Sequence, residues 1–161
     1  MKRVLAWVMA VVALGAAAPA LAVTINCTAS ASSIAFGIYN PLSTTPATST
    51  GSLRVVCTGS GKGSANVTVG VTLSAGLSGS FATRKMFSGA NSLNYNIYWS
   101  TAYTQVMGNG TGGSFAGSAG PFTVFAGGTG TATGTMYGRV PAQQDVAPGS
   151  YVDTILMTVT Y

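Results

Sequence analysis

Regular alternation of apolar and polar side chains is the feature that most limits how this chain can fold. It is clearest in NVTVGVTL (Asn66–Leu73), where three valines and a leucine alternate with Asn, Thr and Gly. The runs SLNYNIYW (Ser92–Trp99) and YVDTILMTVTY (Tyr151–Tyr161) repeat the pattern. Side chains two residues apart share one face of a β-strand, so this period predicts strands with one buried face.

Shorter runs and turn residues complete the pattern. Further strands are expected at Leu53–Cys57, Pro121–Phe125 and Thr131–Val140, with a long, bent first strand at Thr24–Gly37. Gly- and Pro-containing turns such as Ala147–Gly149 separate the runs. No helical periodicity appears after the first 22 residues. The sequence therefore predicts an all-β protein built as a β-sandwich.

The start of the chain predicts export. A short basic start precedes an apolar stretch from Val4 to Ala18, and a small–x–small triplet ends at Ala22. This order is typical of a secretory signal peptide at residues 1–22, cleaved after Ala22. Residues 23–161 then form a single mature domain. A membrane anchor is the alternative, but no basic stop-transfer flank follows the apolar stretch.

Composition argues against catalysis and against nucleic-acid binding. The chain has no His, and its only two acidic residues are Asp145 and Asp153, each expected as a turn or edge charge. General bases are therefore scarce. Of the seven basic residues two lie in the leader, which leaves five scattered cations against two acids. We expect no enzyme, no cofactor, no metal site, no nucleic acid and no small-molecule substrate.

The mature chain keeps two cysteines, Cys27 and Cys57. In an exported chain an even number of cysteines predicts a disulfide, and this pair is the only intramolecular choice. The bond closes a loop of about 30 residues and contributes about 3–4 kcal/mol in the chain-entropy model. A metal pair or a catalytic thiol is the alternative, but there is no histidine to complete a zinc site or to activate a thiol.

Several segments taken together resemble a known family. They are CTASASSIAFGIYNPL (27–42), LRVVCTG (53–59), SLNYNIYWS (92–100), YGRVPAQQDVAPGSYVDTI (137–155) and the closing MTVTY. Their order and spacing are similar, over nearly the whole mature chain, to the spore coat protein U domain. Subunits of archaic, Csu-type chaperone–usher pili share this domain.

The resemblance implies an incomplete immunoglobulin-like β-sandwich, pilin-like, with one strand supplied by a partner. A periplasmic chaperone supplies this strand first, and an adjacent subunit replaces it at the outer-membrane usher. The apolar last strand fits this scheme, because an unpaired apolar edge is an aggregation hazard. The family usually joins its first two strands by a disulfide, which fits Cys27 and Cys57. The expected acceptor groove consists of Ile34 and Phe36, taken as first-strand residues, with Ile155, Met157, Val159 and Tyr161.

The resemblance also implies a place in the cell. The protein is expected to be exported through the periplasm of a Gram-negative bacterium to a fimbrium on the cell surface, where such fibres serve adhesion and biofilm formation. Fibre-building relatives carry a donor segment of about ten residues before the first cysteine. Only Val23–Asn26 precede Cys27 here, a reach of about 14 Å. Such a subunit accepts a strand without giving one, which predicts a tip or terminating position, although tip proteins of this type are expected to have two domains.

Two other functions remain open. A free secreted β-sandwich binding module would be complete by itself, with an internal strand from Gly113–Phe125 in the missing place. A spore or cell-envelope coat protein would associate with an envelope and need no usher.

Overall fold

The structure, a computed structural model, describes residues 22–161, and every helix or strand in this range is a β-strand. The strands are β1 (Val23–Ala31), β2 (Ala47–Gly61), β3 (Ser64–Leu73), β4 (Arg84–Ser88), β5 (Asn91–Tyr98), β6 (Gly117–Phe125), β7 (Thr129–Val140) and β8 (Met157–Thr160). The all-β prediction is confirmed. The predicted signal peptide lies outside the described residues except for Ala22. Between residues 22 and 161, no helix is long and apolar enough to cross a membrane.

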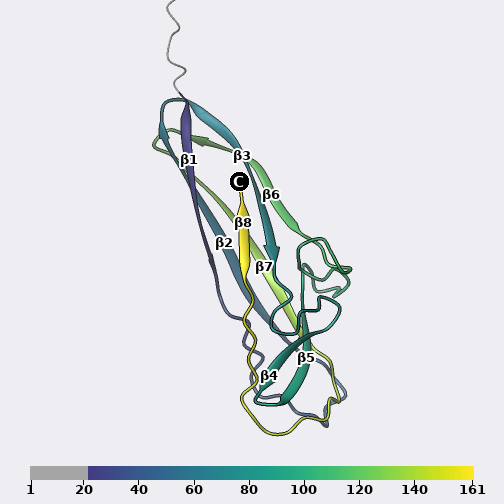
Figure 1. Cartoon of the computed structure of the whole chain (residues 1–161). Helices are drawn as coiled ribbons and strands as arrows, with labels where there is room; N and C mark the ends of the chain where they lie inside the picture. Colours follow the sequence, from purple (N-terminus) through teal and green to yellow (C-terminus); the bar gives the residue numbers. More distant parts are fainter. Residues whose placement is uncertain (1–21) are drawn as a thin grey trace, which may run out of the picture.

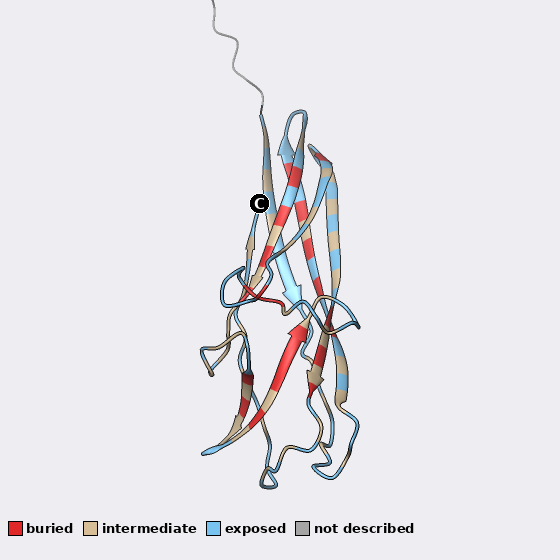
Figure 2. Cartoon of the chain, turned by 90° about the vertical axis from the view of Figure 1, so that its right-hand side faces the viewer, coloured by how far each residue is buried: buried red, intermediate tan, exposed pale blue. Residues whose placement is uncertain are grey.

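The strands form two antiparallel sheets that lie against one another along an elongated body (Figure 1). One sheet has the order β1-β2-β7-β5-β4 and the other the order β6-β3-β8. Burial alternates along the strands, which appears in Figure 2 as red bands between pale ones. The buried side chains of β3 are those that the period-2 pattern predicts, namely Val67, Val69, Val71 and Leu73. The core therefore lies between the sheets.

Backbone hydrogen bonds connect the two sheets along one side of the sandwich. The N–H of Met107 donates to Ile97 O at 2.8 Å, next to β5, and the N–H of Phe115 donates to Val106 O at 2.8 Å. β6, in the other sheet, begins two residues later. On the opposite side the outermost strands are β1 and β8, and no pairing joins them. In Figures 1 and 2 the C-terminal end of β8 lies beside β1.

The first strand is shorter than the sequence predicts. β1 ends at Ala31, and residues 32–37 are not in a strand. Ile34 and Phe36 pack instead over the inner face of β7, where Gly138 leaves them room. A Cβ atom at Gly138 would lie 2.6 Å from Ile34 Cγ2 and 2.7 Å from Phe36 Cζ. Packing over this glycine, which only tertiary structure reveals, replaces strand pairing for this segment.

The sequence did not predict β4, whose first residue is a buried arginine. Arg84 is fully buried, and its Nη2 donates to Ser74 O and Met107 O, both at 2.7 Å. Its Nη1 donates to Asn96 Oδ1 at 2.8 Å, and Phe81 lies against the guanidinium. Burial lowers the pKa of Arg84, although a guanidinium stays charged. These bonds hold the loops on the side of the sandwich where backbone hydrogen bonds connect the two sheets.

Candidate strand-acceptor groove

Of the four outer strands of the two sheets, two have edges that no other part of residues 22–161 covers. Beside β4, Phe87 and Val152 exchange backbone hydrogen bonds of 2.8 and 3.0 Å, so the C-terminal segment covers that edge. β6 contains Pro121, which has no N–H, and its pairing with β3 shifts register at Val67/Val69. A proline and a bulge blunt an edge strand against further pairing. The edges of β1 and β8 have neither protection within residues 22–161.

The free edge of β1 carries both backbone groups and apolar side chains. The N–H of Ser32 donates to Ser52 O at 2.8 Å, so Ser32 is in a hydrogen-bonded pair with its partner next to β2. In an antiparallel ladder hydrogen-bonded pairs alternate with pairs that are not hydrogen-bonded to each other. The backbone N–H and C=O groups of odd-numbered β1 residues, such as Ile25 and Cys27, therefore point away from β2. The side chains of Ile25 and Cys27 are half-buried against the core.

The free edge of β8 has the same arrangement. The N–H of Ser74 donates to Leu156 O at 2.9 Å, and the register pairs Leu73 with Met157. The alternation then turns the backbones of Met157 and Val159 away from β3. They point towards the side of the sandwich where β1 and β8 are outermost and unpaired, which we call the open side. Both side chains are half-buried against the core. Two edges with free backbone groups and apolar side chains therefore border the open side.

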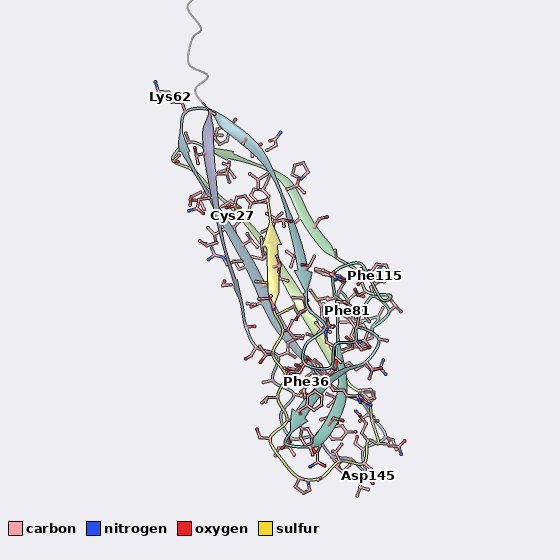
Figure 3. The ribbon with its side chains drawn as sticks, viewed as in Figure 1. Cys27, Phe36, Lys62, Phe81, Phe115 and Asp145 are labelled. Carbon is pink, nitrogen blue, oxygen red and sulfur yellow. A yellow bond between two sulfur atoms is a disulfide. The ribbon has the colours of Figure 1, made fainter. Side chains whose placement is uncertain are left out.

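Below these edges lie two neighbouring cavities. The larger, of about 870 Å³, lies between residues 34–41 and 146–152, and the smaller is about 340 Å³. Ile34 and Phe36 line both cavities, and Ile155 lines the smaller one. Figure 3 shows Phe36 in the lower half of the molecule. We define the acceptor groove as the free edges of β1 and β8 together with these two cavities.

The structure places the predicted groove residues as follows. Ile34 and Phe36 are not first-strand residues, since they follow the end of β1, but they line the cavities at the lower end of the groove. Ile155, Met157 and Val159 are half-buried along the C-terminal segment. Tyr161 lies beyond the end of β8 and is 59% exposed. The sequence reasoning missed Ile25 and Cys27 in β1, although their alternation with Thr24, Asn26 and Thr28 could have revealed them.

A tyrosine and an aspartate form a polar contact beside the groove. The Tyr95 hydroxyl donates to Asp153 Oδ2 at 2.7 Å, and Asp153 Oδ1 accepts the N–H of Leu77 at 2.9 Å. Burial, followed by the hydrogen bond to Asp153 and its negative charge, raises the pKa of Tyr95. Phe36 packs edge-on against the same ring, with 6.0 Å between the centroids. Asp153, expected as a turn or edge charge, therefore fixes the C-terminal segment to β5.

A second polar cluster joins the segments at the lower end of the groove. The Tyr39 hydroxyl donates to Pro141 O at 2.9 Å and accepts the N–H of Gln144 at 2.8 Å. The Gln144 side chain in turn bonds both backbone groups of Asn94, at 2.8 and 2.9 Å. Residues from three of the segments that carry the family resemblance therefore meet here. No single segment reveals this contact.

The disulfide between Cys27 and Cys57 is present, which confirms that prediction, and the described residues include no free cysteine. The two cysteines are directly opposite in the β1–β2 register. Figure 3 labels Cys27 on β1. The bond holds β1 to β2, so this border of the groove does not depend on the backbone ladder alone.

The predicted internal strand does not occupy the open position. Residues 117–125 form β6, which pairs with β3 on the edge opposite β8. The prediction failed because the alternation of side chains indicates that this segment is a strand but does not indicate which strand it pairs with.

Comparisons with known proteins relate this arrangement to one family. The model of the Spore Coat Protein U domain matches residues 12–158. Protein U of Myxococcus xanthus is 31% identical over 135 residues, which cover 78% of this chain and 70% of Protein U. A solved structure, the CsuC–CsuE chaperone–tip adhesion subunit pre-assembly complex of Acinetobacter baumannii archaic chaperone–usher Csu pili, has a similar fold. Its TM-score is 0.56 at 22% identity, over 86% of this chain and 40% of the solved chain.

Proposed function

Because this chain belongs to the spore coat protein U domain family, we propose that it is an exported subunit of a chaperone–usher type pilus or surface fibre, completed by a donated strand. Membership of this family indicates a structural, non-enzymatic protein, in agreement with the prediction from the composition. The proposal adds a specific mode of assembly, in which a partner's strand lies between β1 and β8.

The observation that carries the proposal is the pair of free edges on the open side. A strand placed there can bond the outward-pointing backbones of Ile25 and Cys27 on one side and of Met157 and Val159 on the other. Its alternate side chains then point between the sheets, where these four side chains are half-buried. One added strand therefore removes two unpaired edges and covers an apolar groove.

The proposed partners follow from this geometry. A periplasmic pilus chaperone would occupy the groove first, and an adjacent subunit would replace it at an outer-membrane usher. The fold similarity to a chaperone-bound pilus subunit supports the chaperone as first partner. The protein would then lie at the cell surface as part of a fimbrium, after passage through the periplasm.

We further propose a terminal or tip position in the fibre. Residues 23–26 form the beginning of β1 and pair with residues 58–61 of β2. If the leader is cleaved after Ala22, no residues remain to serve as a donor strand. Mass spectrometry of the exported protein measures where the mature chain begins. A start well before Val23 would restore an ordinary polymerising subunit and leave the acceptor role intact.

Neighbouring residues on β8 provide a matched test of the groove. Val159 is half-buried with its backbone on the open side, whereas Thr160 is exposed on the outer face. The exported chain would be expressed alone and together with an archaic-type pilus chaperone, and the complex would be measured by co-purification. We expect a one-to-one complex that Val159→Lys abolishes and Thr160→Lys leaves intact.

The chain without a chaperone should aggregate or be degraded, because its groove is unfilled. A stable monomer that binds neither the chaperone nor an alternating apolar peptide would refute the proposal. Equal loss of the complex in both lysine variants would also contradict it, because the groove would then have no special role.

A coat protein is the second candidate, favoured by the Spore Coat Protein U domain that the chain contains. It predicts association with a spore or cell envelope in a strain that lacks the usher. Fractionation of envelopes from usher-deleted cells distinguishes the two, because a fibre subunit would then be absent from the surface.

A further inference from the structure

Three tyrosines and an arginine form a cluster on the outer face of the larger sheet, away from the groove. Tyr98 and Tyr137 are opposite one another in the β5–β7 register, on the face that points away from the core. The ring of Tyr103 lies edge-on to Tyr98, with 5.3 Å between centroids. The guanidinium of Arg139 lies 5.2 Å from the centroid of the Tyr103 ring. All four residues are half-buried, so their rings and polar ends remain accessible.

The polar ends of this cluster have no partners within residues 22–161. The hydroxyls of Tyr39, Tyr95 and Tyr151 each donate a hydrogen bond. By contrast, no hydrogen bond satisfies the hydroxyls of the three clustered tyrosines inside the same range. Arg139 likewise has no acceptor and no carboxylate partner there, although its guanidinium carries five N–H donors. The cluster thus combines aromatic surface with unused hydrogen-bonding groups.

The charges of the protein are distributed unequally over its faces. With Arg84 buried, four cations of the described chain are accessible, and three of them, Arg54, Lys85 and Arg139, point outwards from the larger sheet. The fourth, Lys62, lies at the end of the molecule (Figure 3). Neither aspartate lies in a strand of this sheet. The strands of this sheet therefore present outward-pointing cations and no carboxylate.

Exposed hydroxyl groups connect Arg54 to the cluster. Arg54 is opposite Thr133 in the β2–β7 register, and Arg139 follows six residues later on β7, about 20 Å away. The outward residues between them are Thr135 and Tyr137, with Ser52 and Thr50 opposite on β2. A chain molecule lying along β7 would thus meet a cation, several hydroxyls, aromatic rings and a second cation.

We propose that this outer face binds an acidic polysaccharide. Sugar rings would pack on the tyrosine rings, hydroxyls would bond to the threonines and phenols, and carboxylates or sulfates would bond to Arg54 and Arg139. Three cations spread over a hydroxyl-rich face suit a polymer of moderate charge density better than a nucleic acid, whose affinity depends on many clustered phosphate contacts. The site lies on the opposite side of the sheet from the groove, so it does not depend on strand donation.

The test uses the disulfide-bonded chain with its groove filled by an alternating apolar donor peptide, and measures its binding to alginate oligomers, a polyuronate, by isothermal titration calorimetry. Loss of a charge-assisted hydrogen bond predicts that Arg139→Gln weakens binding about tenfold or more. Lys62→Gln removes an equal charge from another part of the surface, so it should change the affinity by less than about twofold after correction for net charge. Tyr137→Ser should weaken binding through loss of the ring while the net charge stays constant.

Dextran, a neutral polysaccharide, and a short DNA duplex serve as comparison ligands. Weak binding of both supports the proposal. Equal affinity for dextran would overturn the requirement for acidic groups, and equal affinity for DNA would show general binding of polyanions. Absence of alginate binding, or equal effects of Arg139→Gln and Lys62→Gln, would refute the site. Thermal melting of each variant identifies any loss caused by unfolding, and Arg54→Gln then tests the proposal at a second position.

Discussion

The contact between Tyr95 and Asp153 allows a sharp test of how the C-terminal segment is held. Tyr95→Phe removes a hydroxyl that donates to Asp153 Oδ2 at 2.7 Å and leaves the ring and its packing in place. Asp153 Oδ1 still accepts the N–H of Leu77, so the aspartate loses one of its partners. We therefore expect a loss of stability without a change of fold.

The size of the effect follows from the environment of the bond. A hydrogen bond to a charged group contributes about 1.5–3 kcal/mol, and the value should lie in the lower half of this range because Asp153 is only half-buried. For a domain of this size, each kcal/mol corresponds to a shift of roughly 2–4 °C in Tm. The variant should thus unfold about 3–9 °C below the parent protein.

The same bond predicts how stability depends on pH. Burial and the interaction with Asp153 raise the pKa of Tyr95 in the folded state, so the folded protein holds this proton more tightly than the unfolded chain does. The stability that this interaction contributes is complete at pH values below the unfolded-state tyrosine pKa of about 10. It is lost as the pH rises above that value. In that range the free energy of unfolding falls by up to about 1.4 kcal/mol per pH unit for one proton. The Tyr95→Phe variant should lack this part of the pH dependence.

The assay is thermal unfolding of the oxidised protein, complexed with one and the same donor peptide in every variant, followed by circular dichroism between pH 7 and pH 11. Tyr98→Phe is the matched control, because no hydrogen bond to the Tyr98 hydroxyl forms within residues 22–161. It should change stability by less than about 0.5 kcal/mol. Equal Tm values for Tyr95→Phe and Tyr98→Phe at pH 7 would refute the reasoning, as would an unchanged alkaline loss of stability in Tyr95→Phe.

Two further substitutions test the borders of the groove. Replacing both Cys27 and Cys57 by Ser should lower the free energy of unfolding by about 3–4 kcal/mol, measured by urea denaturation of the peptide-complemented protein, because the disulfide closes a loop with a sequence separation of 30 residues. A loss below about 1 kcal/mol would show that β1 is held almost entirely by other contacts. Gly138→Val should cost about 1–3 kcal/mol or more, since a Cβ atom there would overlap Ile34 and Phe36. Unchanged stability would mean that these side chains do not pack over β7.

The alternation of side chains determined the secondary structure well. The runs of β3 and β5 predict both the strands and the faces that are buried, because burial of one sheet face imposes the same period on sequence and structure. Residues 32–37, residues 151–156 and β4 were predicted less well, since β8 begins only at Met157. Ile34 and Phe36 continue the alternation of apolar and polar residues although they lie after the end of β1. Arg84 is of a residue type usually found at the surface, yet it is buried. Local pattern carries no information about such long-range contacts.

The sequence by itself also indicated the protein's class: a disulfide-bonded, all-β chain with few groups that could serve catalysis, expected to be exported. These properties depend on residue types and short-range periodicity, which are visible without coordinates. Only the tertiary structure decided which strand edges remain free. It placed β6 beside β3, covered β4 with Val152 and left β1 and β8 facing the open side. The order of strands in a sheet is set by contacts between residues far apart in the chain, so alternation alone could not reveal where a strand is missing.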